Sequence, residues 1–285
     1  MHFHKKENSE KEHFKFRKKD WWKYLLAVIL ILIYLFPFYV IVVMSFKPIT
    51  DTSSRLSLPD VFYLGNYISL FDGGMILNGI KNSLIITVAS LLIEVILGSM
   101  AAYPLSRNQS KFNEKIRMII MGVMMISPLS VLVGVYSILS GMGAISTYWG
   151  LVLVVSAFGL PMAIYLYSNF ISSIPKALDE AAEIDGANHL QIFWHIILPQ
   201  LKTVTVTVII LQGVGLWNEY TYSLYVMQKQ EMFTITLVIK SYFSQVATDY
   251  GGAAAAACIG MLPVVIAYLF LQKYFIQGSI DSAVK

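Results

Sequence analysis

Residues 24–46 read YLLAVILILIYLFPFYVIVVMSF and contain no charged side chain. A helix needs about 20 apolar residues to cross the ~30 Å of hydrocarbon in a bilayer. The stretch follows a hydrophilic segment, residues 1–23, that includes eight lysines and arginines. It is too long for the apolar core of a signal peptide, and no small-residue cleavage site follows it. We therefore expect an uncleaved membrane-spanning helix, kinked at Pro37.

Five further stretches of the chain are long and apolar enough to span a membrane, two of them with one acid each, Glu94 and Glu219. They are residues 82–106, 118–140, 147–170, 203–222 and 251–271. Charged residues make up 13% of the chain, about half of the ~25% that is usual in soluble domains. Prolines inside the spans, among them Pro37, Pro128, Pro161 and Pro263, fit either tolerated kinks or broken helices that line a cavity. The sequence predicts an all-α integral membrane protein with six transmembrane helices in a single domain, residues 24–275.

Lysine and arginine are distributed unequally between the two sides that six spans define. With the N-terminus in the cytoplasm, the interior segments hold sixteen of the 21 basic residues. These segments are residues 1–23, 107–117, 171–202 and 272–285. Because basic residues favour cytoplasmic loops, we expect both termini in the cytoplasm. Residues 1–23 would form a basic tail attracted to anionic lipid, and residues 276–285 a second cytoplasmic tail.

The longest interior segment between spans, residues 171–202, has unusual chemistry for a connector. Its first half predicts a short helix with small apolar residues on one face and acids near its start, where the helix dipole favours them. Those acids are Asp179, Glu180 and Glu183. Gly186 would end this helix in the left-handed conformation, and a second short helix would follow at residues 187–194. Small residues flanked by acids suit docking into a groove of another protein.

The spacing within this loop resembles the EAA loop of ABC importer permeases. An E-A-A triplet is followed after three residues by glycine, and nine residues later by I-x-L-P. The matching residues are Glu180, Ala181, Ala182, Gly186, Ile196, Leu198 and Pro199, and Asp185 agrees with the carbohydrate branch of the family. Further matches are Asn82–Leu84, Ala101–Tyr103 with Arg107, and Trp217–Glu219. The chain is most similar to the maltose-permease G-like subunits of that family.

The resemblance implies a permease subunit that forms half of the pore for ATP-driven sugar uptake in the bacterial plasma membrane. The coupling loop, residues 171–199, would dock its first helix in a cleft of a cytoplasmic ATPase. Glu180 would engage a basic ATPase residue, Ala181 and Ala182 would permit close approach, and Gly186 would set the corner. The implied partners are a homologous second permease, two ATPase copies and an extracellular sugar-binding protein. The alternative is a surface connector whose acids merely follow the helix dipole.

The sequence contains no G-x-x-x-x-G-K-[ST] loop to cradle ATP phosphates. We therefore expect no cofactor on this chain, with ATP and Mg bound by the partner ATPase, and we assign no enzymatic activity, metal site or nucleic-acid partner. An ion-driven secondary transporter would show several intramembrane ionisable groups or paired inverted repeats. A membrane enzyme would show a clustered catalytic set. Neither feature is evident.

Two groups of residues are candidates for the substrate path. Glu94 lies within a predicted span, where a charge costs roughly 2.5–3.5 kcal/mol. It would either line the pore or serve as a buried partner, protonated or hydrogen-bonded, inside the helix bundle. Trp217, Asn218, Glu219 and Tyr220 combine aromatic faces with hydrogen-bonding groups, a mixture that suits sugars. The alternative for these four is an interfacial aromatic belt, and the sequence does not identify the sugar.

Overall fold

The computed structural model describes residues 21–108, 110–243 and 249–283. Every regular element with defined bounds in these ranges is a helix. Most of the predicted basic tail, residues 1–20, lies outside the described residues, and so do the last two residues of the predicted C-terminal tail. The prediction of an all-α chain is confirmed for the part that the structure describes.

Four helices are long and apolar enough to cross a membrane. They are α1 (Trp21–Ser45), α3 (Met75–Arg107), α6 (Tyr148–Ser173) and α13 (Tyr250–Ala283), the last over its first 21 residues. They coincide with the first, second, fourth and sixth predicted spans. Helix α13 continues through most of residues 276–285, where we expected a tail. A multi-pass membrane protein is therefore confirmed.

Two pairs of helices are sharply bent: the first bend falls inside the third predicted span, and the second falls just before the fifth. Helices α4 (Lys111–Met124) and α5 (Pro128–Gly141) meet at a bend of 100°. The other pair, residues 189–200 and α10 (Lys202–Trp217), meets at 73°. The described residues thus contain four candidate spans, or up to six if each bent pair crosses the membrane once.

Proline chemistry explains the sharper of these bends. Pro128 has no N–H to bond to the preceding turn, and its ring disfavours helical geometry at the residue before it. Ser127 accordingly takes an extended conformation, with φ −66° and ψ 131°. The interruption that we expected at Pro128 is therefore a full change of direction rather than a kink within one helix.

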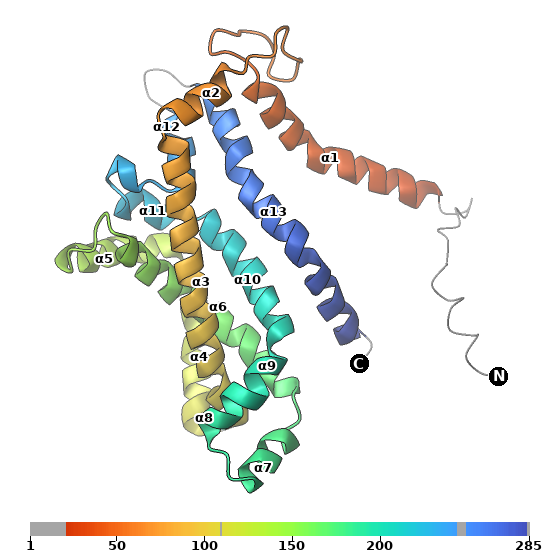
Figure 1. Ribbon diagram of the computed structural model, residues 1–285, viewed down its shortest axis with the longest axis vertical. Helices are drawn as coiled ribbons and strands as arrows, with labels where there is room; N and C mark the ends of the chain where they lie inside the picture. The colour runs from red at the N-terminus through yellow and green to blue at the C-terminus, as the bar shows by residue number, and fades with distance from the viewer. Residues whose placement is uncertain (1–20, 109, 244–248, 284–285) are drawn as a thin grey trace.

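The short helices lie at the two ends of the long ones (Figure 1). At one end are α2 (Gly65–Asp72) and α12 (Ile235–Ser241), with α11 (Thr221–Val226) and the 3₁₀ turn η3 (Gln230–Met232) nearby. At the opposite end lie α7 (Ala177–Ile184), α8 (His189–Ile192), the π-helix η2 (Phe193–Ile197) and α9 (Leu198–Gln200). The predicted short helices of the interior loop are therefore present at the end of the bundle.

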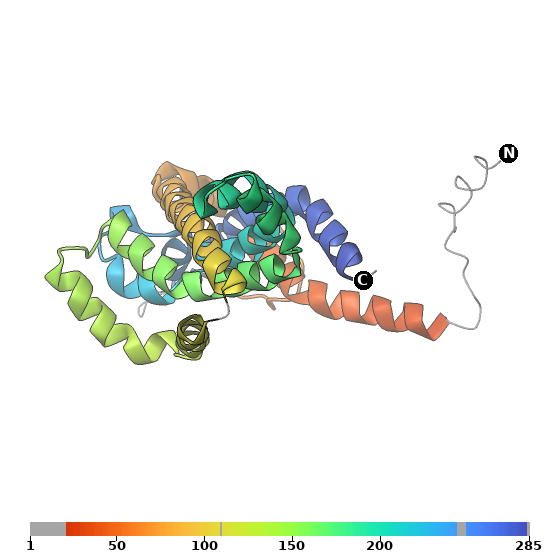
Figure 2. The same cartoon turned by 90° about the horizontal axis from the view of Figure 1, so that it is seen from below.

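Helices α3 and α6 form the centre of the bundle, packed along one another, and α10 packs against both. A Cβ added at Gly98 of α3 would lie 2.9 Å from the Ala163 Cβ of α6, so the two backbones approach closely there. Helix α1 lies against α13 at one end and then projects away from the rest of the chain (Figure 2). Only 6% of its apolar window is buried, as expected for a helix that faces lipid or another membrane subunit.

Candidate functional site

Helix α7 presents two different faces to its surroundings. Asp179 and Ala182, three residues apart and so on one side of the helix, are buried within the chain, at 7% exposure each. Glu180 and Ala181 are exposed. The helix is thus attached through one face and leaves an acid and a small residue free on the other.

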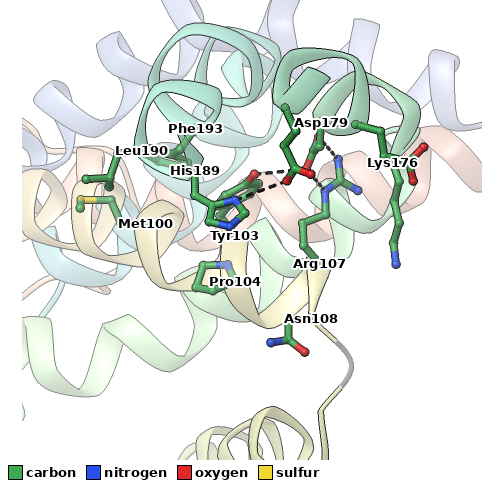
Figure 3. A pocket seen from close by; sticks show the side chains of 12 residues that line it. Met100, Tyr103, Pro104, Arg107, Asn108, Lys176, Asp179, His189, Leu190 and Phe193 are labelled. Carbon is green, nitrogen blue, oxygen red and sulfur yellow. Dashed lines mark hydrogen bonds and ion pairs between the residues drawn. The ribbon is translucent and has the colours of Figure 1, made fainter. Parts of the chain in front are cut away.

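The buried carboxylate of Asp179 forms an ion pair with Arg107 at the end of α3 (Figure 3). The Arg107 Nε donates to Oδ2 at 2.7 Å, and Nη2 donates to Oδ1 at 3.0 Å. The Tyr103 hydroxyl also donates to Oδ2, at 3.2 Å. The Arg107 Nη1 donates to the carbonyls of Ile171 and Ile174 at 3.2 and 2.9 Å. This network joins α7 to the ends of α3 and α6.

Ala182 adds an apolar attachment beside this network. It belongs to a buried cluster that includes Tyr103, Tyr167, Ile171 and Phe193. The rings of Tyr103 and Phe193 lie 5.8 Å apart in a tilted arrangement. Of the two alanines that we expected at a partner surface, Ala181 is exposed and Ala182 packs inside its own subunit.

Gly186 ends α7 as predicted. Its φ is +85°, in the left-handed region that favours glycine. The Gly186 N–H donates to the Glu183 carbonyl at 3.0 Å, and the Ala187 N–H donates to the Ala182 carbonyl at 2.9 Å. This pair of bonds is the Schellman arrangement at a helix C-terminus. The left-handed corner predicted from the sequence is confirmed.

The other members of the predicted coupling set lie at the ends of the loop. Asp185 is the exposed C-cap residue of α7. Leu198 is partly buried against the same apolar cluster as Ala182. Pro199 is exposed in α9, next to the 73° bend into α10. Leu198 and Pro199 therefore connect the loop to α10 rather than to the free face of α7.

A cavity of about 550 Å³ lies between the end of α3 and the loop (Figure 3). Its apolar lining includes Met100, Tyr103, Leu190 and Phe193. Its ionisable lining includes Lys176, Glu180, Glu183 and His189. The exposed acid Glu180 thus belongs to a recess whose lining combines apolar side chains with the Arg107–Asp179 ion pair.

Glu94 lies in α3 with its side chain fully buried. Neither carboxylate oxygen has a hydrogen-bond partner among the described residues, and a Cβ added at Gly159 of α6 would collide with the carboxylate. The Gln212 amide of α10 donates to the Gly159 carbonyl at 2.8 Å. In this conformation Glu94 therefore points between α3, α6 and α10, inside the subunit.

Residues 217–220, the last residue of α10 and the three that follow it, have separate environments. The Trp217 Nε1 donates to the Gly260 carbonyl of α13 at 3.0 Å. The Glu219 carboxylate accepts bonds from the Tyr222 and Ser223 N–H groups at 2.6 and 2.9 Å, and so caps α11. Asn218 and Tyr220 are exposed. Helix α10 accordingly ends at Trp217, five residues before the predicted end of the fifth span.

None of the described cavities is lined by both Glu94 and residues 217–220. Trp217 lines a mostly apolar cavity of about 150 Å³ together with Thr87 and Pro263, and Glu94 is not among its lining residues. The role of these residues in a substrate path stays a prediction.

The site contains a pairing that sequence reasoning did not reveal. From the sequence, Asp179 is only an acid favoured by the helix dipole, and Arg107 is only part of the family resemblance. The two residues lie 72 positions apart, so no local spacing could indicate their contact. The available signals were an arginine at the end of one predicted span and an acid in the loop on the same side of the membrane.

Comparison with known proteins places this architecture in a family. Residues 94–280 match the family model described as "Binding-protein-dependent transport system inner membrane component". The chain is 37% identical over 262 residues to the melibiose/raffinose/stachyose import permease protein MelC of Bacillus subtilis, covering 92% of this chain and 95% of that protein. It is also 37% identical over 279 residues to the probable starch degradation products transport system permease protein AmyC of Thermoanaerobacterium thermosulfurigenes, covering 94% and 99% of the two chains.

A solved structure has the same fold. A chain from the crystal structure of a bacterial ABC transporter involved in the import of the acidic polysaccharide alginate matches with a TM-score of 0.75 at 21% identity. The match covers 91% of this chain and 99% of that chain.

Proposed function

This chain belongs to the family of binding-protein-dependent transport system inner membrane components, and we propose that it couples sugar import to a separate ATPase through α7. It is a permease subunit of an ABC importer, and the import of oligosaccharides named for MelC supports a sugar as its substrate. The proposed pore has two halves, one from this chain and one from a homologous second permease. A sugar-binding protein on the exterior, as the family description suggests, would deliver the substrate.

The observation that carries the coupling proposal is the division of α7 into an attached face and a free face. Asp179 and Ala182 are held inside the chain, whereas Glu180 and Ala181 are exposed. Glu180 can meet a basic residue of a partner, and Ala181 permits close approach of its backbone. Because the attached face is fixed by an ion pair and apolar packing, a force on the free face is transmitted to the bundle. These features support docking of an ATPase that binds ATP and Mg itself.

We propose six crossings, with each bent helix pair counted as one span and both termini in the cytoplasm. This topology puts α7 on the cytoplasmic side, and α2 and α12 outside. The excess of basic residues in the segments then assigned to the interior supports it. Labelling of single cysteines introduced at Asp60 and at Glu183 checks the two sides. In intact cells a membrane-impermeant maleimide should label position 60 alone.

The proposed substrate path includes Glu94 and residues 217–220 at the end of α10. Asn218 and Tyr220 are the members with exposed side chains, and so they are suited to direct contact with sugar hydroxyls and ring faces. Trp217 and Glu219 hold this segment in place through their bonds to α13 and α11. Glu94 would act from inside the bundle, through the packing of α3 against α6.

The function is tested with the permease pair, the ATPase and the binding protein reconstituted in liposomes. Glu180→Arg reverses the charge on the free face of α7, and we expect weaker ATPase binding together with lower ATP-driven uptake. The matched control is Glu114→Arg, which reverses an acid on α4 instead. Equal uptake and equal ATPase binding by wild type and Glu180→Arg would contradict the coupling role of α7.

A further inference from the structure

We propose that Arg107 is a positioning residue of the coupling mechanism, which clamps α7 to the ends of α3 and α6 so that the three move together. The proposal rests on the proposed function. It adds the side chain through which a displacement of α7 reaches the helices within the membrane.

The guanidinium of Arg107 uses its full fork geometry. Two of its nitrogens bind both oxygens of Asp179, and the third binds the carbonyls of Ile171 and Ile174. The side chains of the ion pair are only 12% and 10% exposed, so water weakens the pair little. A lysine, with one compact ammonium group, cannot occupy these four acceptors in the same geometry.

The carbonyl contacts make this a three-way junction. The last carbonyls of a helix have no partner within the helix, and a cation near them is favoured by the helix dipole. Arg107 supplies that cation to the end of α6, although its own backbone ends α3. Through the same side chain it holds Asp179 of α7. One residue thus connects three elements that lie far apart in the sequence.

Apart from the Tyr103 hydroxyl, which donates to Asp179, the other attachments of α7 are less directional. Ala182 is fixed by apolar contact through a single methyl group. The Glu183 carboxylate lies 3.6 Å from the His189 Nδ1 of α8, and both side chains are exposed. A Cβ added at Gly186 would have no atom within 4 Å, so the corner is open. Of the ion pairs in the described residues, only that of Arg107 joins α7 to a long helix.

A force delivered at Arg107 reaches two helices at once. Helices α3 and α6 pack along one another, and the close approach of Gly98 to Ala163 leaves little room for them to slide independently. Close-packed interiors transmit strain. The clamp therefore converts a movement of a short surface helix into a movement of the central helix pair, instead of a local rearrangement of the loop.

The test measures sugar uptake and ATP hydrolysis on the same reconstituted importer. Asp179→Asn removes the charge of the pair but keeps the shape and the Arg107 bonds to α6, and Arg107→Lys keeps the charge but loses the fork. The matched control is Arg117→Lys, since Arg117 also donates to a carbonyl at the end of α3, that of Leu105, without touching α7.

We expect both clamp variants to retain bound ATPase and basal hydrolysis while the sugar imported per ATP falls about fivefold or more, the lower range of allosteric coupling. The control should keep the wild-type ratio. An unchanged ratio in both clamp variants would overturn the proposal. So would a parallel loss of bound ATPase, hydrolysis and uptake, because that result means that Arg107 only holds the loop in its fold. A wild-type importer that neither binds an ATPase nor uses ATP would instead overturn the proposed function itself, and the clamp with it.

Discussion

Replacing Gly186 by alanine tests how strongly docking of α7 depends on the corner that ends it. The φ of +85° costs an L-residue roughly 1–2 kcal/mol. A Cβ at this position meets no atom within 4 Å, so no steric term adds to that cost. If the chain relieves the strain by distorting the corner, the affinity for the ATPase falls by about 5- to 30-fold, the factor that corresponds to one or two kcal/mol.

The assay is the dissociation constant of the ATPase from the permease pair in lipid nanodiscs. The matched variant is Gly186→Asn, because asparagine visits the left-handed region more readily than alanine does. We expect binding to weaken in the order glycine, asparagine, alanine. Equal affinity of all three would show that the corner has no part in docking. Equal weakening by asparagine and alanine would show that the effect comes from side-chain bulk and not from backbone strain.

Three other substitutions test the interior of the bundle. Glu219→Ala removes the carboxylate that caps α11 at Tyr222 and Ser223, so thermal unfolding in detergent should show a loss of about 1–2 kcal/mol. Glu94→Gln should change the uptake rate more than membrane insertion, and equal uptake would remove Glu94 from the proposed path. Gly159→Ala should lower the unfolding temperature, because its Cβ would collide with the Glu94 carboxylate; the double variant Gly159→Ala, Glu94→Ala should recover part of the loss, which two independent sites would not do.

The long helices could be predicted from the sequence because their signal is local. Uninterrupted apolar stretches identify α1, α3, α6 and α13 wherever the rest of the chain lies. The corner at Gly186 was predictable for the same reason, since a glycine after a short amphipathic segment is a sufficient sign of a helix end.

The bent helices were harder to predict from hydropathy. Pro128 indicated an interruption of the third span, but the size of the bend depends on how α4 and α5 pack against other helices. The early end of α10 has a different cause. The Glu219 carboxylate caps a new helix, α11. The aromatic and aliphatic residues of α11 continue the apolar run when only hydropathy is considered.

The contacts of the site depend on pairs of residues far apart in the chain. The partner of Asp179 is set by where α3 ends relative to α7, which sequence spacing does not encode. The same holds for Ala181 and Ala182, which look equivalent in the sequence. Only the packing of α7 against Tyr103 and Phe193 decides which of the two alanines is buried.

That difference between neighbouring alanines allows the most direct test of α7 as the docking element. A photo-crosslinking amino acid is placed at Ala181 or at Ala182 in the permease pair, and the complex with the ATPase is irradiated. We predict a covalent adduct with the ATPase from position 181, and from position 182 only adducts within the permease. If position 181 gave no ATPase adduct while the ATPase stayed bound to the complex, α7 would not be the docking element.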